Sequence, residues 1–127
     1  TIPSINSTMP MVMFEGWHEE GVKHLLNGSE TNNGASGSQD IDKALDNLFY
    51  HSNTAPFVSK LLIQRMVKSN PSPEYIERVA SIFVNNGTGV RGDLAAVVKA
   101  ILIDEEARHC SWLDDAASGK MREPMIR

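Results

Sequence analysis

The fold is decided by residues 72–87, which read SPEYIERVASIFVNNG. Ser72 is a helix-capping residue, and Pro73 suits the first helical position because its missing N–H has no partner there. Asn86-Gly87 provides a left-handed stop. Apolar residues between these ends recur at the i, i+3, i+4, i+7 spacing of one helix face: Ile76, Val79, Ala80 and Phe83. The stretch therefore predicts an amphipathic helix over residues 73–85.

Three neighbouring segments repeat this apolar spacing. We expect further helices over residues 41–50, 55–69 and 93–104, the first of them capped by Asp40. Residues 104–108 either extend the last helix or add a turn. Because the helices over 55–69 and 93–104 have the widest apolar stripes, we expect these two to form the centre of the bundle.

The residues before this helical region do not follow a helical period. Val12-Met13-Phe14 suits a short strand, and residues 22–26 alternate weakly between apolar and polar. Residues 27–38 contain nothing apolar larger than alanine, which indicates a loop. We therefore expect an irregular arm, or at most a short β-hairpin, before the helices.

Together these patterns predict a mainly α fold, a four-helix compact domain with an N-terminal arm. The expected organisation is a loop-rich arm over residues 1–39, a helical core over residues 40–110 and a C-terminal tail over residues 111–127. Because the chain starts at Thr1 rather than Met, we expect it to be a piece of a longer polypeptide, with the tail leading into further segments.

The apolar stripe of the helix over residues 55–69 is wider than three short helices and an arm would cover. We therefore expect an exposed apolar patch, which would contact the rest of the parent polypeptide or allow the chain to self-associate.

Composition excludes several classes of function. Charged residues make up 22% and hydrophobic residues 41%, as in ordinary globular domains. Twelve Lys and Arg against sixteen Asp and Glu give a net charge of −4, which disfavours binding to nucleic acid. The single cysteine, Cys110, excludes an internal disulfide framework. No apolar run is long enough to span a membrane.

Residues 87–92 fit the dinucleotide-binding pattern G-x-G-x-x-G. That pattern binds a pyrophosphate where a strand leads into it and a helix follows. Here the preceding residues, 76–84, have helical periodicity, so we interpret the glycines as a sharp turn between two packed helices and expect no cofactor. A weaker alternative is that Arg91 and the helix that Asp93 caps hold an anion.

His18-Glu19-Glu20 and His24 superficially resemble a zinc-protease signature. Two histidines on one helix share a metal when they lie four residues apart, whereas these lie six apart with Gly21 between them. His109-Cys110 has no third ligand nearby in the sequence. We therefore predict no metal site and a free thiol at Cys110.

Five polar side chains at the expected ends of elements are the remaining candidates for a site, because catalytic groups gather at such positions. They are His18, His51, Arg65, Arg91 and Asp93. Convergence of these side chains on one cleft would favour an enzyme, in which His51 is a general acid or base. Scattering over the surface would favour a structural role, such as that of a histidine at a helix C-terminus.

Many runs of this sequence occur in the order typical of one family. They are HSNTAPF (51–57), LIQR (62–65), SNPSPEY (69–75), RVA (78–80), NGTGVRGDL (86–94), AIL (100–102), EAR (106–108) and GKMREP (119–124). Trp17-His18 and the run GVKHLLNG (21–28) fit too, with Glu19 for the usual Asp and His24 for the usual Thr. The chain resembles the large bacterial domain-of-unknown-function family catalogued as number 1800.

The resemblance implies a piece of a protein several times longer than this chain. It also implies an exported bacterial protein, of a kind often encoded beside phosphatase- or sulfatase-like proteins. No activity, cofactor or catalytic residue set comes with the family.

Two hypotheses of different class follow. The favoured one is a non-catalytic helical module of a larger exported protein, which serves packing or partner contact. The alternative is that the chain contributes part of a hydrolase-like enzyme site, completed by residues outside it.

Overall fold

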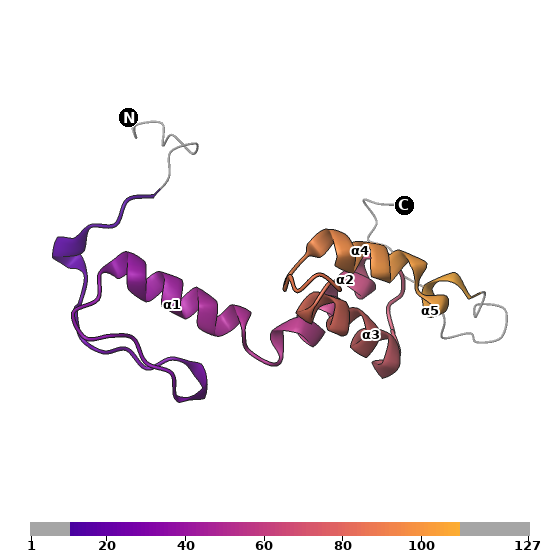
Figure 1. Ribbon diagram of the computed structural model, residues 1–127, viewed down its shortest axis with the longest axis horizontal. Coiled ribbons are helices and arrows are strands. Elements are labelled where there is room, and N and C mark those ends of the chain that lie inside the picture. The colour runs from indigo at the N-terminus through magenta and orange to yellow at the C-terminus, as the bar shows by residue number, and fades with distance from the viewer. Residues whose placement is uncertain (1–10, 110–127) are drawn as a thin grey trace. The chain divides into compact units, whose positions relative to one another are not determined.

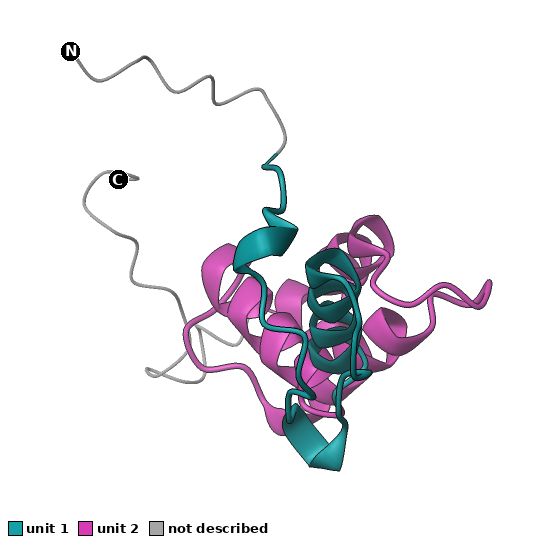
Figure 2. Ribbon diagram, turned by 90° about the vertical axis from the view of Figure 1, so that its left-hand side faces the viewer, with its two compact units in different colours: residues 1–51 teal, residues 52–127 magenta. Residues whose placement is uncertain are grey.

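The computed structural model describes residues 11–109 and has a mainly α fold, as predicted (Figure 1). Contacts divide the chain into two compact units, unit 1 (Thr1–His51) and unit 2 (Ser52–Arg127), drawn in teal and magenta in Figure 2. The four main helices form where the sequence predicts them, with ends displaced by up to four residues. The expected arm, core and tail remain a prediction, and the tail lies outside the described residues.

Unit 2 contains α2 (Thr54–Met66), α3 (Pro73–Val84), α4 (Leu94–Ile103) and the single turn α5 (Glu105–Arg108). Ser72 caps α3 through its side chain and Asp93 caps α4, both as predicted. Residues 104–108 add a separate turn because Asp104 leaves the helical conformation and caps α5. Among the described helices, none has the length and apolar composition to cross a membrane.

The core of unit 2 is centred on α3, which corrects the expectation that the second and fourth helices form the centre. Helix α3 packs against both α2 and α4, whereas α2 and α4 have only a small contact with each other. Part of the apolar stripe of α2 lies outside this core, and its Phe57 is 63% exposed. A wide stripe is therefore not a measure of burial here. The core residues are Ala55, Ile63, Tyr75, Val79, Ala80, Phe83, Val97 and Ile101.

Tyr75 joins two helices inside this core. Its side chain is fully buried, and its hydroxyl donates to the backbone O of Ile101 at 2.6 Å. Burial, with a further contribution from the nearby Asp104 carboxylate, raises the pKa of Tyr75 to about 12. The phenol is therefore protonated at neutral pH and holds α3 against α4.

Unit 1 is built around α1 (Gly37–Phe49), which begins earlier than predicted. Ser36, not Asp40, is the cap: its hydroxyl accepts from the Gln39 N–H at 3.3 Å, and the Gln39 side chain accepts from the Ser36 N–H at 3.0 Å. This reciprocal capping box satisfies two backbone donors and moves the helix start into the polar loop. Asp40 therefore lies inside the first turn.

The N-terminal β-hairpin that the sequence allowed is not supported. The described part of the arm has the short 3₁₀ turns η1 (Glu15–Trp17) and η2 (Leu26–Gly28) and a single antiparallel bridge between His24 and Glu30. Between the two bridged residues the chain reverses at η2, where Asn27 and Gly28 have φ 57° and 71°, and the pairing does not extend beyond this bridge in the described residues. The irregular-arm alternative is the one observed for residues 11–36.

Ser59 of α2 provides a stability prediction. It is fully buried, and its hydroxyl has no hydrogen-bond partner among the described residues. Because an unsatisfied buried hydroxyl costs free energy, we expect Ser59→Ala to leave the free energy of unfolding unchanged or to raise it by about 1 kcal/mol. Urea unfolding followed by circular dichroism checks this, with Ser81→Ala, which removes a hydroxyl bonded to Glu77 O, as the control. A loss of stability in Ser59→Ala would contradict the assignment.

Candidate functional site

The most buried ionic group of unit 1 is the Asp40 cluster, formed by His18, Lys23 and Asp40. Asp40 is only 7% exposed, and its Oδ2 atom lies 2.7 Å from Lys23 Nζ and 3.1 Å from His18 Nε2. Lys23 Nζ also donates to the backbone O atoms of Glu19 at 2.5 Å and Gly21 at 3.1 Å. All three ammonium protons thus have acceptors, and Lys23 thereby connects the arm to α1.

The electrostatics of the cluster favour its ionised form. The hydrogen bond from Lys23 is the main reason that the pKa of Asp40 lies below its usual value, although burial opposes the shift. The hydrogen bond to Asp40 in turn raises the pKa of Lys23. The pair is therefore charged over the physiological range and ties segments seventeen residues apart.

One ring nitrogen of His18 is hydrogen-bonded to Asp40, and the other has no hydrogen bond. With Nε2 placed on Asp40, Nδ1 is buried and lies 3.8 Å from Glu15 Oε2. A histidine oriented by a carboxylate resembles the general-base arrangement of many hydrolases. The His18 side chain is 11% exposed.

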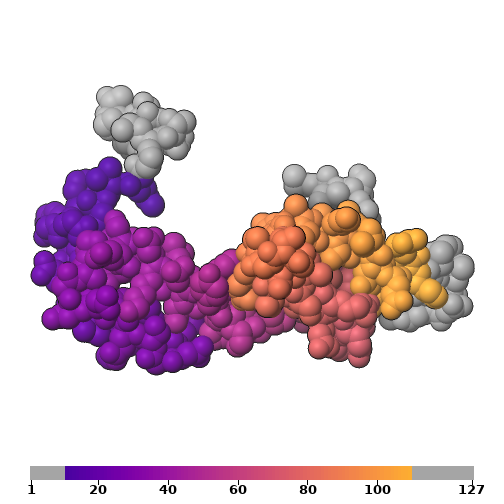
Figure 3. Space-filling model, viewed as in Figure 1, coloured from indigo at the N-terminus to yellow at the C-terminus, as the bar shows by residue number. Residues whose placement is uncertain are grey.

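Within unit 1, the apolar face of α1 is left uncovered. The helix has the clear amphipathic pattern predicted from its sequence, yet the side chains that form its apolar stripe are exposed. The fractional exposures are 49% for Ile41, 58% for Leu45, 52% for Leu48 and 36% for Phe49. The surface of α1, violet to magenta in Figure 3, is visible along the helix. We call Ile41, Leu45, Leu48 and Phe49 the α1 apolar face.

Unit 1 does not bury apolar side chains elsewhere to compensate. In residues 11–51 the buried positions are Thr31, Ala35, Gly37 and Asp40, of which only Ala35 has an apolar side chain. The arm is instead held to α1 by polar contacts, which include the bonds between Leu26 and Asn47 at 3.2 Å in both directions. The α1 apolar face is thus a surface without a core behind it.

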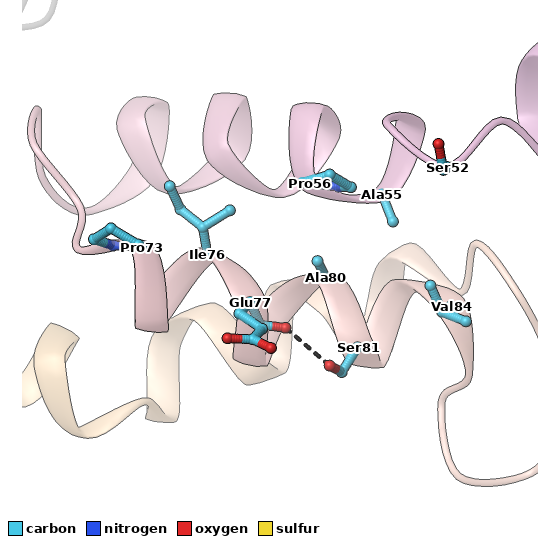
Figure 4. A pocket seen from close by; sticks show the side chains of 9 residues that line it. All are labelled: Ser52, Ala55, Pro56, Pro73, Ile76, Glu77, Ala80, Ser81 and Val84. Atoms are coloured by element: carbon cyan, nitrogen blue, oxygen red, sulfur yellow. Dashed lines mark hydrogen bonds between the residues drawn. The ribbon is translucent and has the colours of Figure 1, made fainter.

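An apolar groove runs between α2 and α3 in unit 2 (Figure 4). It has a volume of about 560 Å³ and arises because small side chains, Ala55 and Ala80, face each other across the two helices. Its one charged lining residue is Glu77, and Ser81 donates to the Glu77 backbone O at 2.9 Å. The groove has room for an apolar ligand but brings together no nucleophile and base.

The glycine-rich loop between α3 and α4 is held by asparagine side chains. Asn85 Oδ1 accepts from the N–H groups of Gly87 and Gly89, each at 2.9 Å. Asn86 Oδ1 accepts from the N–H groups of Thr88 and Val90, and its Nδ2 donates to Asp93 at 2.7 Å. The backbone donors that would face a pyrophosphate are therefore used within the loop, in agreement with a turn between helices.

Two carboxylates fasten the C-terminal end of the described helices. Asp104 accepts two hydrogen bonds from Arg78, at 2.8 and 2.7 Å. Glu106 accepts from Lys68 Nζ and the Ser72 N–H, both at 3.0 Å, and from the Ser72 hydroxyl. Glu106 thus ties the connection between α2 and α3 to α5.

These two carboxylates predict acid sensitivity of unit 2. The bond from Arg78 lowers the pKa of Asp104, and although burial opposes it, the bonds from Ser72 and Lys68 lower the pKa of Glu106. Because both folded-state values are depressed, their stabilisation is present above the unfolded-state values of about 4 and is lost as the pH falls through the folded values. Urea unfolding between neutral and acid pH should show this decline. Glu106→Gln should flatten it, whereas the exposed control Glu105→Gln should not.

The family model that describes a protein of unknown function, DUF1800, matches residues 4–127. The chain belongs to the DUF1800 family. The predicted resemblance is thereby confirmed. No curated protein and no solved structure matches the chain.

This DUF1800 chain places the five sequence candidates as follows. His18 lies in the Asp40 cluster at the start of α1, whereas His51 follows the other end of that helix. In unit 2, Arg65 lies in the last turn of α2, whereas Arg91 stacks on Phe83 at 5.3 Å near the last turn of the antiparallel α3. Within each unit, therefore, the structure does not gather the candidates at one site: Arg91 and Asp93 are neighbours in one loop but have different partners, Phe83 for Arg91 and Asn86 for Asp93.

His18 and His24, which the sequence predicts do not share a metal, each contact a different carboxylate. His24 Nδ1 lies 2.8 Å from Glu30, and His18 binds Asp40. No group of three or more His, Cys, Asp or Glu side chains in residues 11–109 is arranged to hold a metal. Cys110 lies outside the described residues.

Sequence reasoning missed Lys23 and Glu106. Each acts on a partner far along the chain, Asp40 and Ser72 respectively, so no local spacing signals the contact. The one local signal for the Asp40 cluster is Asp40 itself. Because Ser36 caps the helix, the Asp40 carboxylate in the first turn is left to bind other partners.

Proposed function

We propose that this DUF1800 chain is a helical interaction module that self-associates through the α1 apolar face. The observation that carries the proposal is an amphipathic helix whose apolar stripe is about half exposed and has no apolar core behind it. Stripes of this kind in folded proteins mark contact surfaces.

A second copy of the chain is the partner that this surface fits best. The stripe is straight and continuous over two helical turns, from Ile41 to Phe49. An apolar stripe is complementary to itself about a two-fold axis, because Leu45 near its middle meets the same residue of the other copy. Two helices packed in this way bury the stripe of both copies at once.

The introduction of a charge into the stripe tests the proposal. Leu45→Glu places a carboxylate at the centre of the contact, where pairing with itself is unfavourable. We expect light scattering to show an associated species for the parent chain and a monomer for Leu45→Glu. The matched control is Leu102→Glu on α4, which makes the same change at a leucine of similar exposure, 52% against 58%.

Two results would overturn this assignment. One is a molar mass of Leu45→Glu equal to that of the parent chain. The other is an equal decrease in molar mass for Leu102→Glu, which would indicate that exposed apolar residues associate without specificity. Circular dichroism should confirm that both variants keep the helix content of the parent chain.

We also propose that the module belongs to a longer, exported bacterial protein, on the basis of the family resemblance alone. Fractionation of cells that produce the full-length protein tests this. Recovery outside the cytoplasm is the expected result, and recovery in the cytoplasm would contradict it.

The second candidate function is a contribution to a hydrolase-like site. The observation in its favour is His18, which Asp40 orients at 3.1 Å with Nδ1 left without a hydrogen bond. Hydrolysis of p-nitrophenyl acetate by the chain and by His18→Asn distinguishes the two candidates. The interaction module predicts equal background rates for both, whereas a catalytic His18 predicts that the rate falls in the variant.

A further inference from the structure

The chain contains three Asn-Gly dipeptides, at residues 27–28, 33–34 and 86–87. In an Asn-Gly sequence the backbone nitrogen of glycine can attack the side-chain amide of asparagine, because no side chain on glycine hinders the approach. All three dipeptides lie in described segments, so their environments can be compared directly.

The attacking nitrogen is engaged in two of the three. Gly34 N–H donates to the backbone O of Glu20 at 2.8 Å. Gly87 N–H donates to Asn85 Oδ1 at 2.9 Å. By contrast, the Gly28 N–H makes no hydrogen bond outside the turn η2 among the described residues, and that turn is distorted at Asn27, which has φ 57° and ψ 31°.

The reacting side chain is also held differently. Asn86 is fixed by the loop, with Oδ1 accepting from Thr88 and Nδ2 donating to Asp93. Asn27 is exposed in the loop between Leu25 and Ser29, and its side-chain amide makes no hydrogen bond with the described residues. Both reacting groups of the 27–28 dipeptide are thus accessible.

We propose that Asn27 is a site of spontaneous deamidation in the folded protein and that Asn33 and Asn86 are protected. The Gly28 nitrogen bonds to Cγ of Asn27, the bond from Cγ to the amide nitrogen breaks, and ammonia leaves. Water then opens the resulting succinimide to an aspartate or an isoaspartate at position 27. The reaction needs water and no other co-reactant.

The modified position lies beside a contact that fastens the arm. Leu26 exchanges hydrogen bonds with Asn47 of α1, and Leu25 N–H donates to Ser29 O at 2.7 Å. An isoaspartate adds a methylene group to the backbone between these contacts. Deamidation at Asn27 therefore changes both the charge and the backbone length of this loop.

Peptide mapping after incubation of the folded chain tests the proposal. Trypsin gives a peptide of residues 24–43, which contains Asn27 and Asn33, and one of residues 79–91, which contains Asn86. Mass spectrometry with fragmentation locates the mass change from NH₂ to OH. Breaking a hydrogen bond before attack slows a reaction on the order of tenfold, so Asn27 should react at least that much faster than the other two.

The unfolded chain provides the control. In urea the structural differences disappear, and the three sites should react at similar rates. Asn27→Gln should abolish the modification of peptide 24–43 in the folded chain without raising that of peptide 79–91. An Asn27 that stays intact in the folded chain, or an Asn33 or Asn86 that reacts as fast, would overturn the proposal.

Discussion

Replacing Ile63 by alanine is expected to lower the free energy of unfolding of unit 2 by about 2–5 kcal/mol. Ile63 is fully buried on the inner face of α2 and belongs to the core that α3 organises. The truncation removes apolar contacts and leaves a cavity that the surrounding helices fill only in part. Urea unfolding followed by circular dichroism measures the change.

The matched control lies on the same helix. Leu61 has a similar volume but is 45% exposed, so Leu61→Ala should cost far less than Ile63→Ala. Equal losses for the two variants would show that the assignment of inner and outer faces of α2 is wrong.

Replacing Asp40 by alanine is expected to release the arm from α1. The variant removes the buried carboxylate that accepts from Lys23 and His18, and it leaves the partly exposed ammonium of Lys23 without its counter-charge. Cleavage by trypsin after Lys23 reports the effect directly, because trypsin must bind the lysine side chain before it cleaves. In the parent chain the ammonium of Lys23 is held by three acceptors, so cleavage after it should be slow and should become rapid in Asp40→Ala.

Asp42→Ala is the control for this experiment, because Asp42 is an exposed carboxylate in the same helix. Cleavage after Lys23 should be unchanged in that variant. If Asp40→Ala and the parent chain were cleaved equally fast, the Asp40 cluster would not be what fastens the arm.

The helices of this protein follow from local sequence signals. The caps at Ser72 and Asp93 and the apolar spacing between them place α3 and α4 within one residue of the predicted ends. These signals act over one or two turns, so they are readable without knowledge of the rest of the fold.

What the sequence did not predict depends on contacts between distant residues. The central position of α3 arises from its packing against two neighbours, which stripe width alone does not reveal. The Asp40 cluster joins residues 18, 23 and 40, whereas the local sequence pattern predicts only a capping role for Asp40. The exposure of the α1 apolar face is likewise invisible to periodicity, which predicts an apolar face but not what covers it.

Sedimentation of the unmodified chain over a range of concentrations tests the central claim most directly. If the α1 apolar face joins two copies, the weight-average mass rises from that of a monomer towards that of a dimer as the concentration increases. A monomer mass at every concentration would contradict the claim.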